Sequence, residues 1–355
     1  MSYLFAILLF SFLIFIHELG HFAAAKAFGV QVNEFSLFMG PALFQKQIGQ
    51  TVYSVRCIPI GGFCAMEGED GEEPSDNPHA FPNAAWWKKA VILAAGAFMN
   101  FVVGVLLMLA FFAPDKQFIM PVVSEVDPRC SFAGEAGIQA GDRLWSIDGE
   151  RIYVSSDFSM LLSLKGGKTH DLVVLRGGKR VSLPNLDLRK QDFENEDGTV
   201  TQRYGFSFTL CNDSPGVTLG YSWNSTLDCV RLVRLSLQML LRGQAGVQDV
   251  SGPVGIVQQM ATVADNSGSA YYAFLNMIYF GSFIAINLSV MNLLPIPALD
   301  GGRVVGVLLS AAYEGITKKK PNPKIEGYIH GAGMVLLMAL MVLLLFKDII
   351  FAIKG

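Results

Sequence analysis

The residues in this sequence best suited to chemistry are His17, Glu18 and His21, which form a complete HExxH motif. On a helix, residues four apart lie one turn above one another, so both imidazoles can reach a single zinc ion. Glu18 follows His17 directly and turns away from ligation, which leaves it placed to take a proton from a water that the metal activates. The motif therefore predicts a hydrolytic zinc site on a helix.

The motif lies in an apolar N-terminal stretch. Residues 3–16 are fourteen residues without charge, too few to cross a hydrocarbon core that needs about 20. A span is completed only by continuing through the motif to about Ala25, which puts three ionisable residues at membrane depth, where such groups are usually functional. The alternatives are a buried helix with a chance motif and a signal peptide, but no Lys or Arg precedes the apolar stretch.

The composition indicates a polytopic membrane protein. Of the 355 residues, 52% are hydrophobic and 16% are charged, and the mean hydropathy is +0.40. In soluble proteins about a quarter of the residues are charged. The net charge of −3 gives no reason to expect nucleic acid as a partner. Five scattered cysteines without a CxxC pair indicate neither a disulfide framework nor a cysteine–zinc site.

Residues 30–63 carry β-branched and aromatic residues in partial alternation, interrupted by Gly40-Pro41, Gly49 and Gly61-Gly62. This pattern predicts strands joined by tight turns. Because the segment is short and apolar, we expect a hairpin that lies against the membrane or dips into it beside the zinc site. Its edge could accept an extended peptide by strand addition. The alternative is a hairpin that only packs.

Residues 116–187 change character, with charge, glycine and short alternating strands. The runs 121–128, 136–142 and 144–152 are similar to the PDZ domains of membrane and envelope proteases, and Asp142 stands where the chain must bend sharply. PDZ domains bind extended peptides at a sheet edge. The sequence leaves open whether this module binds peptide or acts as a steric filter.

Apolar helical segments make up most of the remaining chain. A second span follows Trp86, and Asn100 within it either packs between helices or touches substrate. Residues 223–242 carry a polar stripe that predicts an amphipathic helix in the membrane interface. Third and fourth spans are expected at 273–294 and 328–346. The polar stripe consists of Arg231, Arg234, Gln238 and Arg242.

A catalytic zinc site needs three protein ligands and one open position. Pro295 and Pro297 cannot continue a regular helix, and exposed backbone at such a break is tolerated in a membrane only against protein or a wet cavity. Asp300 follows this break and precedes two glycines, so it is the candidate for the third ligand. Asp300 could instead only cap the next helix, but the HExxH motif favours ligation.

Three features together resemble the bacterial site-2 proteases, in particular the RseP/RasP type with a single PDZ domain. They are the HExxH motif, the PDZ-like insert and the run Asn292-Leu-Leu-Pro-Ile-Pro-Ala-Leu-Asp-Gly-Gly302. Residues 40–41 and 59–63 also resemble the membrane-reentrant β-loop of that family. The resemblance covers essentially the whole chain. Ala97 is a departure, because a proline commonly follows the glycine at this place in the second span.

The resemblance implies an intramembrane zinc metalloprotease. Its expected substrates are single-span membrane proteins cut within their transmembrane segments, such as anti-sigma factors or remnant signal peptides. The implied cofactor is Zn²⁺, and the implied site residues are His17, His21 and Asp300 as metal ligands, Glu18 as general base, and Asn292, Pro295 and Pro297 as substrate-binding residues.

The expected fold is a polytopic α-helical membrane protein with four transmembrane helices, a membrane-reentrant β-hairpin and an inserted β-rich PDZ-like domain. The expected divisions are transmembrane helix 1 with HExxH at 1–29, the reentrant β-loop and a cytoplasmic loop at 30–89, transmembrane helix 2 at 90–114, the extracytoplasmic PDZ-like domain and linker at 115–215, amphipathic helices at 216–270, transmembrane helix 3 at 271–302, a cytoplasmic loop at 303–327 and transmembrane helix 4 at 328–355.

Basic residues in short loops predict the orientation, because such loops stay in the cytoplasm. We expect a multi-pass protein of the bacterial cytoplasmic (inner) membrane. The PDZ-like domain and both termini would face outside, with the zinc nearer the cytoplasmic side. The basic residues are Lys26, Lys46, Arg56, Lys88 and Lys89 between the first two spans, and Arg303, Lys318, Lys319, Lys320 and Lys324 between the last two.

Two other functions are compatible with parts of the sequence. One is a catalytically inactive membrane scaffold or adaptor in which the PDZ-like module is the working part. The intact set of His17, Glu18, His21 and Asp300 argues against it. The other, a soluble zinc protease on a membrane anchor, fails because the ligands would lie inside the spans.

Overall fold

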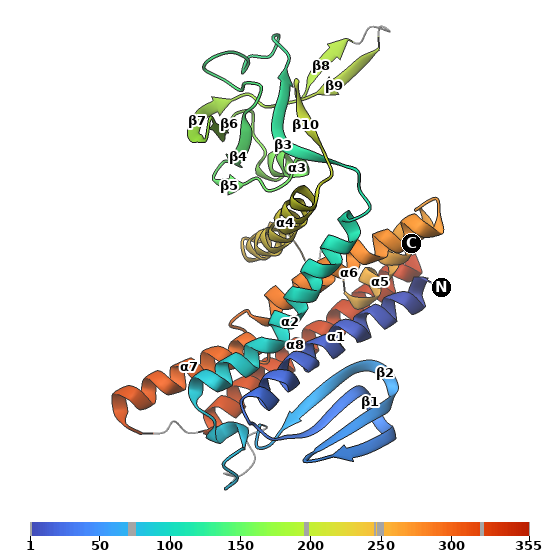
Figure 1. The fold of residues 1–355 in the computed structure, drawn as a ribbon, viewed down its shortest axis with the longest axis vertical. Coiled ribbons are helices and arrows are strands. Elements are labelled where there is room, and N and C mark those ends of the chain that lie inside the picture. Colours follow the sequence, from blue (N-terminus) through green and yellow to red (C-terminus); the bar gives the residue numbers. More distant parts are fainter. Residues whose placement is uncertain are drawn as a thin grey trace. The chain divides into compact units, whose positions relative to one another are not determined.

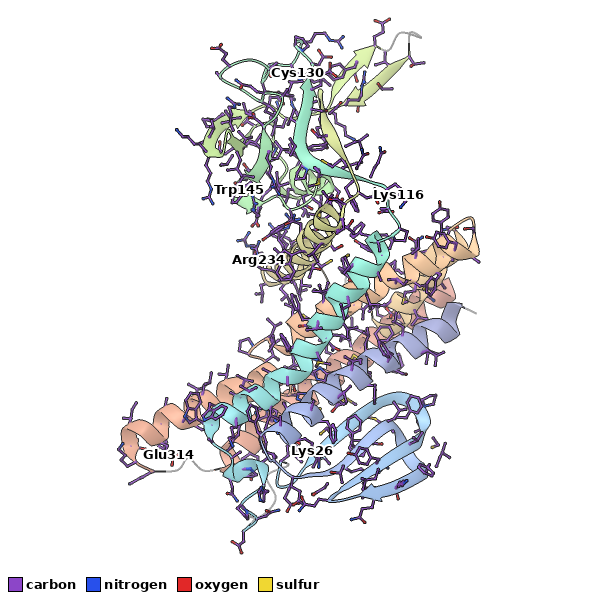
Figure 2. All side chains as sticks on the ribbon, in the orientation of Figure 1. Lys26, Lys116, Cys130, Trp145, Arg234 and Glu314 are labelled. Carbon is purple, nitrogen blue, oxygen red and sulfur yellow. The ribbon has the colours of Figure 1, made fainter. Side chains whose placement is uncertain are left out.

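The computed structural model describes residues 2–69, 76–194, 199–244, 246, 252–319 and 323–354 (Figures 1 and 2). The chain forms two compact units. Unit 1 consists of residues 1–111 and 229–355, and unit 2 of residues 112–228. Unit 1 holds the apolar helices and the first two strands, and unit 2 holds the other described strands.

Four helices in the described part of the chain are long and apolar enough to cross a membrane. By length and composition, these helices agree with the four predicted spans. Helix α2 continues without a break through Ala97, the position where a proline is common in the family that the sequence resembles. The spans are Ile7–Ala27 within α1 (Ser2–Ala27), α2 (Trp86–Phe112), α6 (Ala270–Asn292) and Gly327–Asp348 within α8 (Pro323–Lys354).

Small residues let these helices approach one another closely, as is usual in membranes. A Cβ atom on Gly20 of α1 would lie 2.4 Å from the carbonyl oxygen of Ala95 in α2. Also on α2, a Cβ on Gly104 would lie 2.6 Å from Cγ1 of Ile286 in α6. The Ser282 hydroxyl of α6 also donates a hydrogen bond of 2.7 Å to the Gly104 carbonyl. Helix α2 is therefore packed tightly against both α1 and α6.

Three further helices complete the α-helical part. They are α4 (Pro215–Leu241), α5 (Pro253–Asp265) and α7 (Asp300–Thr317). Helix α4 begins earlier than the predicted amphipathic segment, and Arg231 is only 5% exposed. One residue of the predicted polar stripe is therefore buried, while the placement of this helix in the membrane interface stays a prediction. The predicted helix near Pro253 is present as α5, and Asp348 of α8 accepts hydrogen bonds from the backbone N–H groups of Gly252 and Gly255 at its start.

The two strands of unit 1, β1 (Val32–Ile48) and β2 (Thr51–Met66), form a hairpin that folds back on itself. Gly40 and Gly61 have positive φ, which permits the bends. The segment Glu34–Leu37 is paired on both sides, with 62–65 and with 52–55. The hairpin therefore makes a small sheet whose outermost segments are 42–48 and 62–66.

Unit 2 is β-rich, as predicted. Its main sheet has the strand order β10-β3-β4-β6-β7, with β5 paired to β4. Helix α3 (Ser156–Lys165) lies between β5 and β6 in the chain, and Phe158 of α3 packs against Phe206 and Phe208 of β10. The strands are β3 (Gln117–Val126), β4 (Arg143–Ile147), β5 (Glu150–Arg151), β6 (His170–Arg176), β7 (Lys179–Leu186), the hairpin of β8 (Gln191–Glu194) and β9 (Val200–Arg203), and β10 (Phe206–Asn212).

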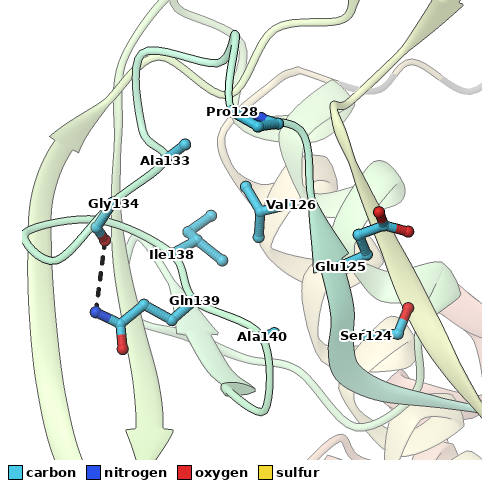
Figure 3. Close-up of a pocket in the computed structure, with 9 residues that line it drawn as sticks. All are labelled: Ser124, Glu125, Val126, Pro128, Ala133, Gly134, Ile138, Gln139 and Ala140. Atoms are coloured by element: carbon cyan, nitrogen blue, oxygen red, sulfur yellow. Dashed lines mark hydrogen bonds between the residues drawn. The ribbon is translucent and has the colours of Figure 1, made fainter.

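An open groove of about 490 Å³ lies in unit 2 between Ser124–Val126 of β3 and the loop that contains Ala133 and Ile138 (Figure 3). Asp142 holds the end of this loop. Its carboxylate is 1% exposed and accepts hydrogen bonds from the Gln139 N–H at 2.9 Å and from two nitrogens of Arg176 at 2.7 and 2.8 Å. The buried Asp142 carboxylate thus connects the loop to β6 through its hydrogen bonds with Gln139 and Arg176.

We expect Asp142→Asn to lower the free energy of unfolding of unit 2 by about 1.5–3 kcal/mol, because a buried charge-assisted pair loses one partner. The matched control is Asp187→Asn, whose partner Arg189 is exposed. Exposed pairs are worth about 0–1 kcal/mol. Thermal unfolding and limited proteolysis of the purified chain measure both. Equal stability of the two variants would contradict the prediction.

Candidate metal centre

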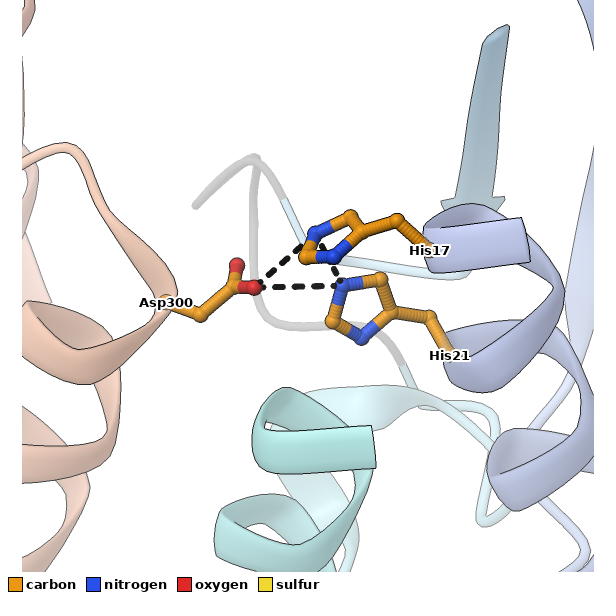
Figure 4. Close-up of side chains that lie close together, drawn as sticks. All are labelled: His17, His21 and Asp300. Atoms are coloured by element: carbon orange, nitrogen blue, oxygen red, sulfur yellow. Dashed lines mark hydrogen bonds and ion pairs between the residues drawn. The ribbon is translucent and has the colours of Figure 1, made fainter. Parts of the chain in front are cut away.

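Helix α1 brings the two imidazoles of the HExxH motif together. His17 and His21 lie on successive turns, and their Nε2 atoms are 3.2 Å apart (Figure 4). Both side chains are largely buried, with 12% and 9% of their surface exposed. Two neutral imidazole nitrogens aimed at the same point make poor partners for one another, since each presents a lone pair.

Asp300, the first residue of α7, faces this pair from the other side (Figure 4). Its Oδ2 atom lies 3.0 Å from His17 Nε2 and 3.4 Å from His21 Nε2. The sequence therefore predicted correctly that two segments far apart in the chain lie close together. The cap of α7 is Leu299, which makes no side-chain cap hydrogen bond.

The turn between α6 and α7 places Asp300 by close backbone packing. A Cβ on Gly301 would lie 2.3 Å from the Leu293 carbonyl, and one on Gly302 would lie 2.2 Å from the Ile296 carbonyl oxygen. Ala298 has a φ of +77°, a conformation that non-glycine residues rarely adopt. The two glycines are therefore required for the compact turn that ends at the carboxylate.

Helix α8 supports this turn. The backbone N–H of Ala298 donates to Nδ1 of His330 at 3.2 Å. A Cβ on Gly333 would lie 2.5 Å from Cβ of Pro297, so α8 packs directly against the turn. Sequence reasoning left His330 unassigned and did not single out Gly333, because one histidine and one glycine in an apolar helix carry no pattern.

The three atoms fit the ligand set of a zinc ion. Their separations of 3.0, 3.2 and 3.4 Å match a tetrahedral centre with bonds of about 2.0 Å, whose ligand atoms are about 3.3 Å apart. Asp300 Oδ2 is buried and receives no hydrogen bond of acceptable geometry from the described residues. A buried carboxylate oxygen without a proton donor is costly, and a bound cation would satisfy it. His17, His21 and Asp300 could therefore hold zinc, and this assignment stays a prediction.

The second ring nitrogen of His21 has a partner that orients it. Nδ1 lies 2.8 Å from the carbonyl oxygen of Ile92 in α2, so Nδ1 carries the proton and Nε2 keeps its lone pair. Gly96, one turn later, leaves room for both rings, since a Cβ there would lie 2.4 Å from His21 Nε2 and 2.8 Å from His17 Cε1. The sequence did not indicate a role at the site for Ile92 or Gly96. Ile92 contributes only its backbone carbonyl and Gly96 only the space left by its missing side chain, and neither contribution depends on a recognisable sequence pattern.

The other predicted site residues are placed as follows. Glu18 lies on α1 beside the hairpin, since a Cβ on Gly62 of β2 would be 3.7 Å from its Cγ. Asn292 is the last residue of α6, and its amide has no hydrogen-bond partner among the described residues. Pro295 is exposed, whereas Pro297 is partly buried. Their roles with substrate stay predictions.

Comparison with known proteins agrees with this arrangement. The model of peptidase family M50 matches residues 5–340. A Clostridium perfringens protein named as a zinc metalloprotease is 37% identical over 99% of this chain and 100% of its own length. A Clostridium acetobutylicum protein of the same name is 35% identical over 98% of this chain and 97% of its own length. The regulator of sigma-W protease RasP of Bacillus subtilis is 26% identical over 97% of both chains.

The family match covers nearly the whole chain, and the two clostridial relatives align along 98–99% of it. Of the helices that could cross a membrane, α1 carries both histidines, and α6 ends shortly before the turn that leads to Asp300. The chain belongs to peptidase family M50, the site-2 proteases, and is a zinc metalloprotease of the membrane.

Proposed function

We propose that this protease cuts single-span membrane proteins within or at the edge of their transmembrane segments, with zinc held by His17, His21 and Asp300. The observation that carries the proposal is the convergence of three ligand atoms from α1, a helix apolar enough to cross a membrane, and from Asp300 at the start of α7. Ionisable groups at that depth are costly and usually functional. Anti-sigma factors and remnant signal peptides are the proposed substrate classes.

The proposed reaction is hydrolysis with Glu18 as the general base. Held by His17, His21 and Asp300, a zinc ion would supply a Lewis acid for the scissile carbonyl and would lower the pKa of a water towards about 7. Glu18, one residue after His17, takes the proton of the attacking water and delivers it to the leaving amine. The burial of both histidines keeps bulk water away and strengthens electrostatic interactions in the site.

A substrate helix hides its carbonyls in hydrogen bonds, so it must unwind before attack. We propose that the segment 62–66 of β2 and the unpaired amide of Asn292 provide new partners for the unwound strand. The contact of Gly62 with Glu18 puts this segment beside the general base. Pro295 and Pro297, which cannot continue a helix, lie in the α6–α7 turn and are proposed as the remaining part of the substrate site.

The hairpin is proposed to enter the membrane. Large apolar side chains of its outer part are exposed, and such a patch on a protein surface marks contact with lipid or a partner. In line with this, the polar side chains of Glu34, Ser54 and Arg56 pair among themselves within the hairpin. The exposed residues are Met39, Leu43, Phe44, Ile48, Val55 and Ile58.

The proposed orientation keeps the two basic loops, between the first and second and between the third and fourth spans, in the cytoplasm. Unit 2, proposed as a PDZ-like domain, and both termini then face outside. Of the basic residues that support this orientation, Lys320 lies outside the described residues. The proposed location is the bacterial cytoplasmic membrane, with the zinc nearer the cytoplasmic side.

The first test is Glu18→Gln, which removes the base and keeps the shape of the side chain. We expect cleavage of a single-span substrate in proteoliposomes to fall at least about 100-fold, the usual contribution of acid–base catalysis, with zinc content unchanged. Glu314→Gln, on the exposed end of α7, is the control and should cut normally. Unchanged cleavage by Glu18→Gln would refute its role, and full biological activity without cleavage would favour the scaffold.

The second test is Gly96→Ala, which puts a methyl group where the two imidazoles lie. Zinc affinity should fall about 10–100-fold, as for other changes that misplace a metal ligand. Gly104→Ala makes a similar clash with Ile286, away from the histidines. It should lower thermal stability while zinc affinity, measured by competition with a chelator, stays normal. Normal affinity in Gly96→Ala would argue against the ligand set.

The third test is Phe63→Pro, in the segment of β2 beside Glu18. A proline cannot donate a backbone hydrogen bond, so cleavage should fall about 5-fold or more while zinc stays bound, since one lost main-chain hydrogen bond costs about 1 kcal/mol or more. Phe44→Pro, in the opposite outer segment, is the control and should retain activity. Equal cleavage by the two variants would exclude strand addition at 62–66.

A further inference from the structure

Asn100 of α2 is buried in the membrane-spanning part with 1% of its surface exposed. Its amide faces His17, with Nδ2 3.5 Å from the Nδ1 atom of that ring. Its other amide atom, Oδ1, is buried and has no hydrogen-bond partner among the described residues. An orphaned carbonyl oxygen at this depth is costly, which calls for an explanation.

An explanation comes from which ring nitrogen of His17 carries the proton. An amide NH₂ facing Nδ1 requires this nitrogen to be an acceptor, which places the ring proton on Nε2. Nε2, however, is the atom that lies 3.0 Å from Asp300 Oδ2 and 3.2 Å from His21 Nε2. A proton there would exclude a metal ion. Rotation of the Asn100 amide by 180° puts Oδ1 against Nδ1, which gives this oxygen a donor and leaves Nε2 without a proton.

We infer that Asn100 is a positioning residue that accepts a hydrogen bond from Nδ1–H of His17. The bond fixes the ring orientation and the tautomer that leaves the Nε2 lone pair free. It is the counterpart of the Ile92 carbonyl, which does the same for His21. Outer partners of this kind typically contribute about 10–100-fold to metal affinity. The inference rests on the proposed role of His17 as a zinc ligand.

A role in helix packing alone accounts less well for these contacts. Gly96, Asn100 and Gly104 are spaced four apart and share one face of α2. The polar link from this face to α6 is already made by the Ser282 hydroxyl, which bonds to the Gly104 carbonyl. The side-chain contact of Asn100 is with the histidine of α1 instead.

The test compares Asn100→Leu, Asn100→Ala and Asn100→Asp in the purified full chain. Leucine keeps the volume but not the acceptor, alanine keeps neither, and aspartate keeps an acceptor for Nδ1–H. We expect zinc affinity, measured by chelator competition, to fall about 10–100-fold in the leucine and alanine variants. In the aspartate variant it should stay within a few-fold of the unmodified chain. The visible spectrum of bound Co²⁺ should shift in the first two.

Ser282→Ala is the matched control, because it removes the polar packing contact of the same helix face and should leave zinc affinity unchanged. If the leucine variant does not fold, the alanine and aspartate variants decide alone. Normal zinc affinity in Asn100→Leu or Asn100→Ala would overturn the inference. His17→Ala separates the failure of the ligand assignment from the failure of the inference about Asn100. If His17→Ala also binds zinc normally, the ligand assignment fails. If His17→Ala loses zinc and the Asn100 variants do not, only the role of Asn100 fails.

Discussion

The structure depends on satisfying ionisable groups inside an apolar helix bundle. Ligand atoms of His17, His21 and Asp300 lie within 3.4 Å of one another, brought together by the apolar helix α1 and the start of α7. A carboxylate there cannot rely on water, and its nearest neighbours are ring nitrogens. A divalent cation resolves this conflict, because it turns three mutually unsuitable groups into a ligand set. The surrounding helices and the α6–α7 turn are the parts that keep these groups together.

Much of this arrangement could be predicted from the sequence, and the reason is chemical. The HExxH spacing fixes two ligands on one helix, and a proline-containing break followed by Asp300 leaves few alternatives for the third. Length and hydropathy suffice for the four spans, because the hydrocarbon core demands about 20 apolar residues from each. Alternation and glycines were enough to place strands in 30–63 and 116–187.

Other features could not be predicted, because they depend on contacts between distant backbone atoms. The Ile92 carbonyl and the space left by Gly96 have no signature in the sequence. Nor does the double-sided pairing of Glu34–Leu37, which follows from bends at Gly40 and Gly61. The burial of Arg231 could not be predicted either, since a helical stripe shows which residues share a face but not what covers that face.

The packing of α8 gives the last helix an influence on chemistry in which it has no ligand. His330 and Gly333 hold the turn whose far end is Asp300. Because Gly333 leaves no room for a side chain beside Pro297, a shift of α8 at this point would displace the turn and with it Asp300. Helix α8, one of the four helices that could cross a membrane, thus helps to position the third candidate ligand without supplying a ligand itself.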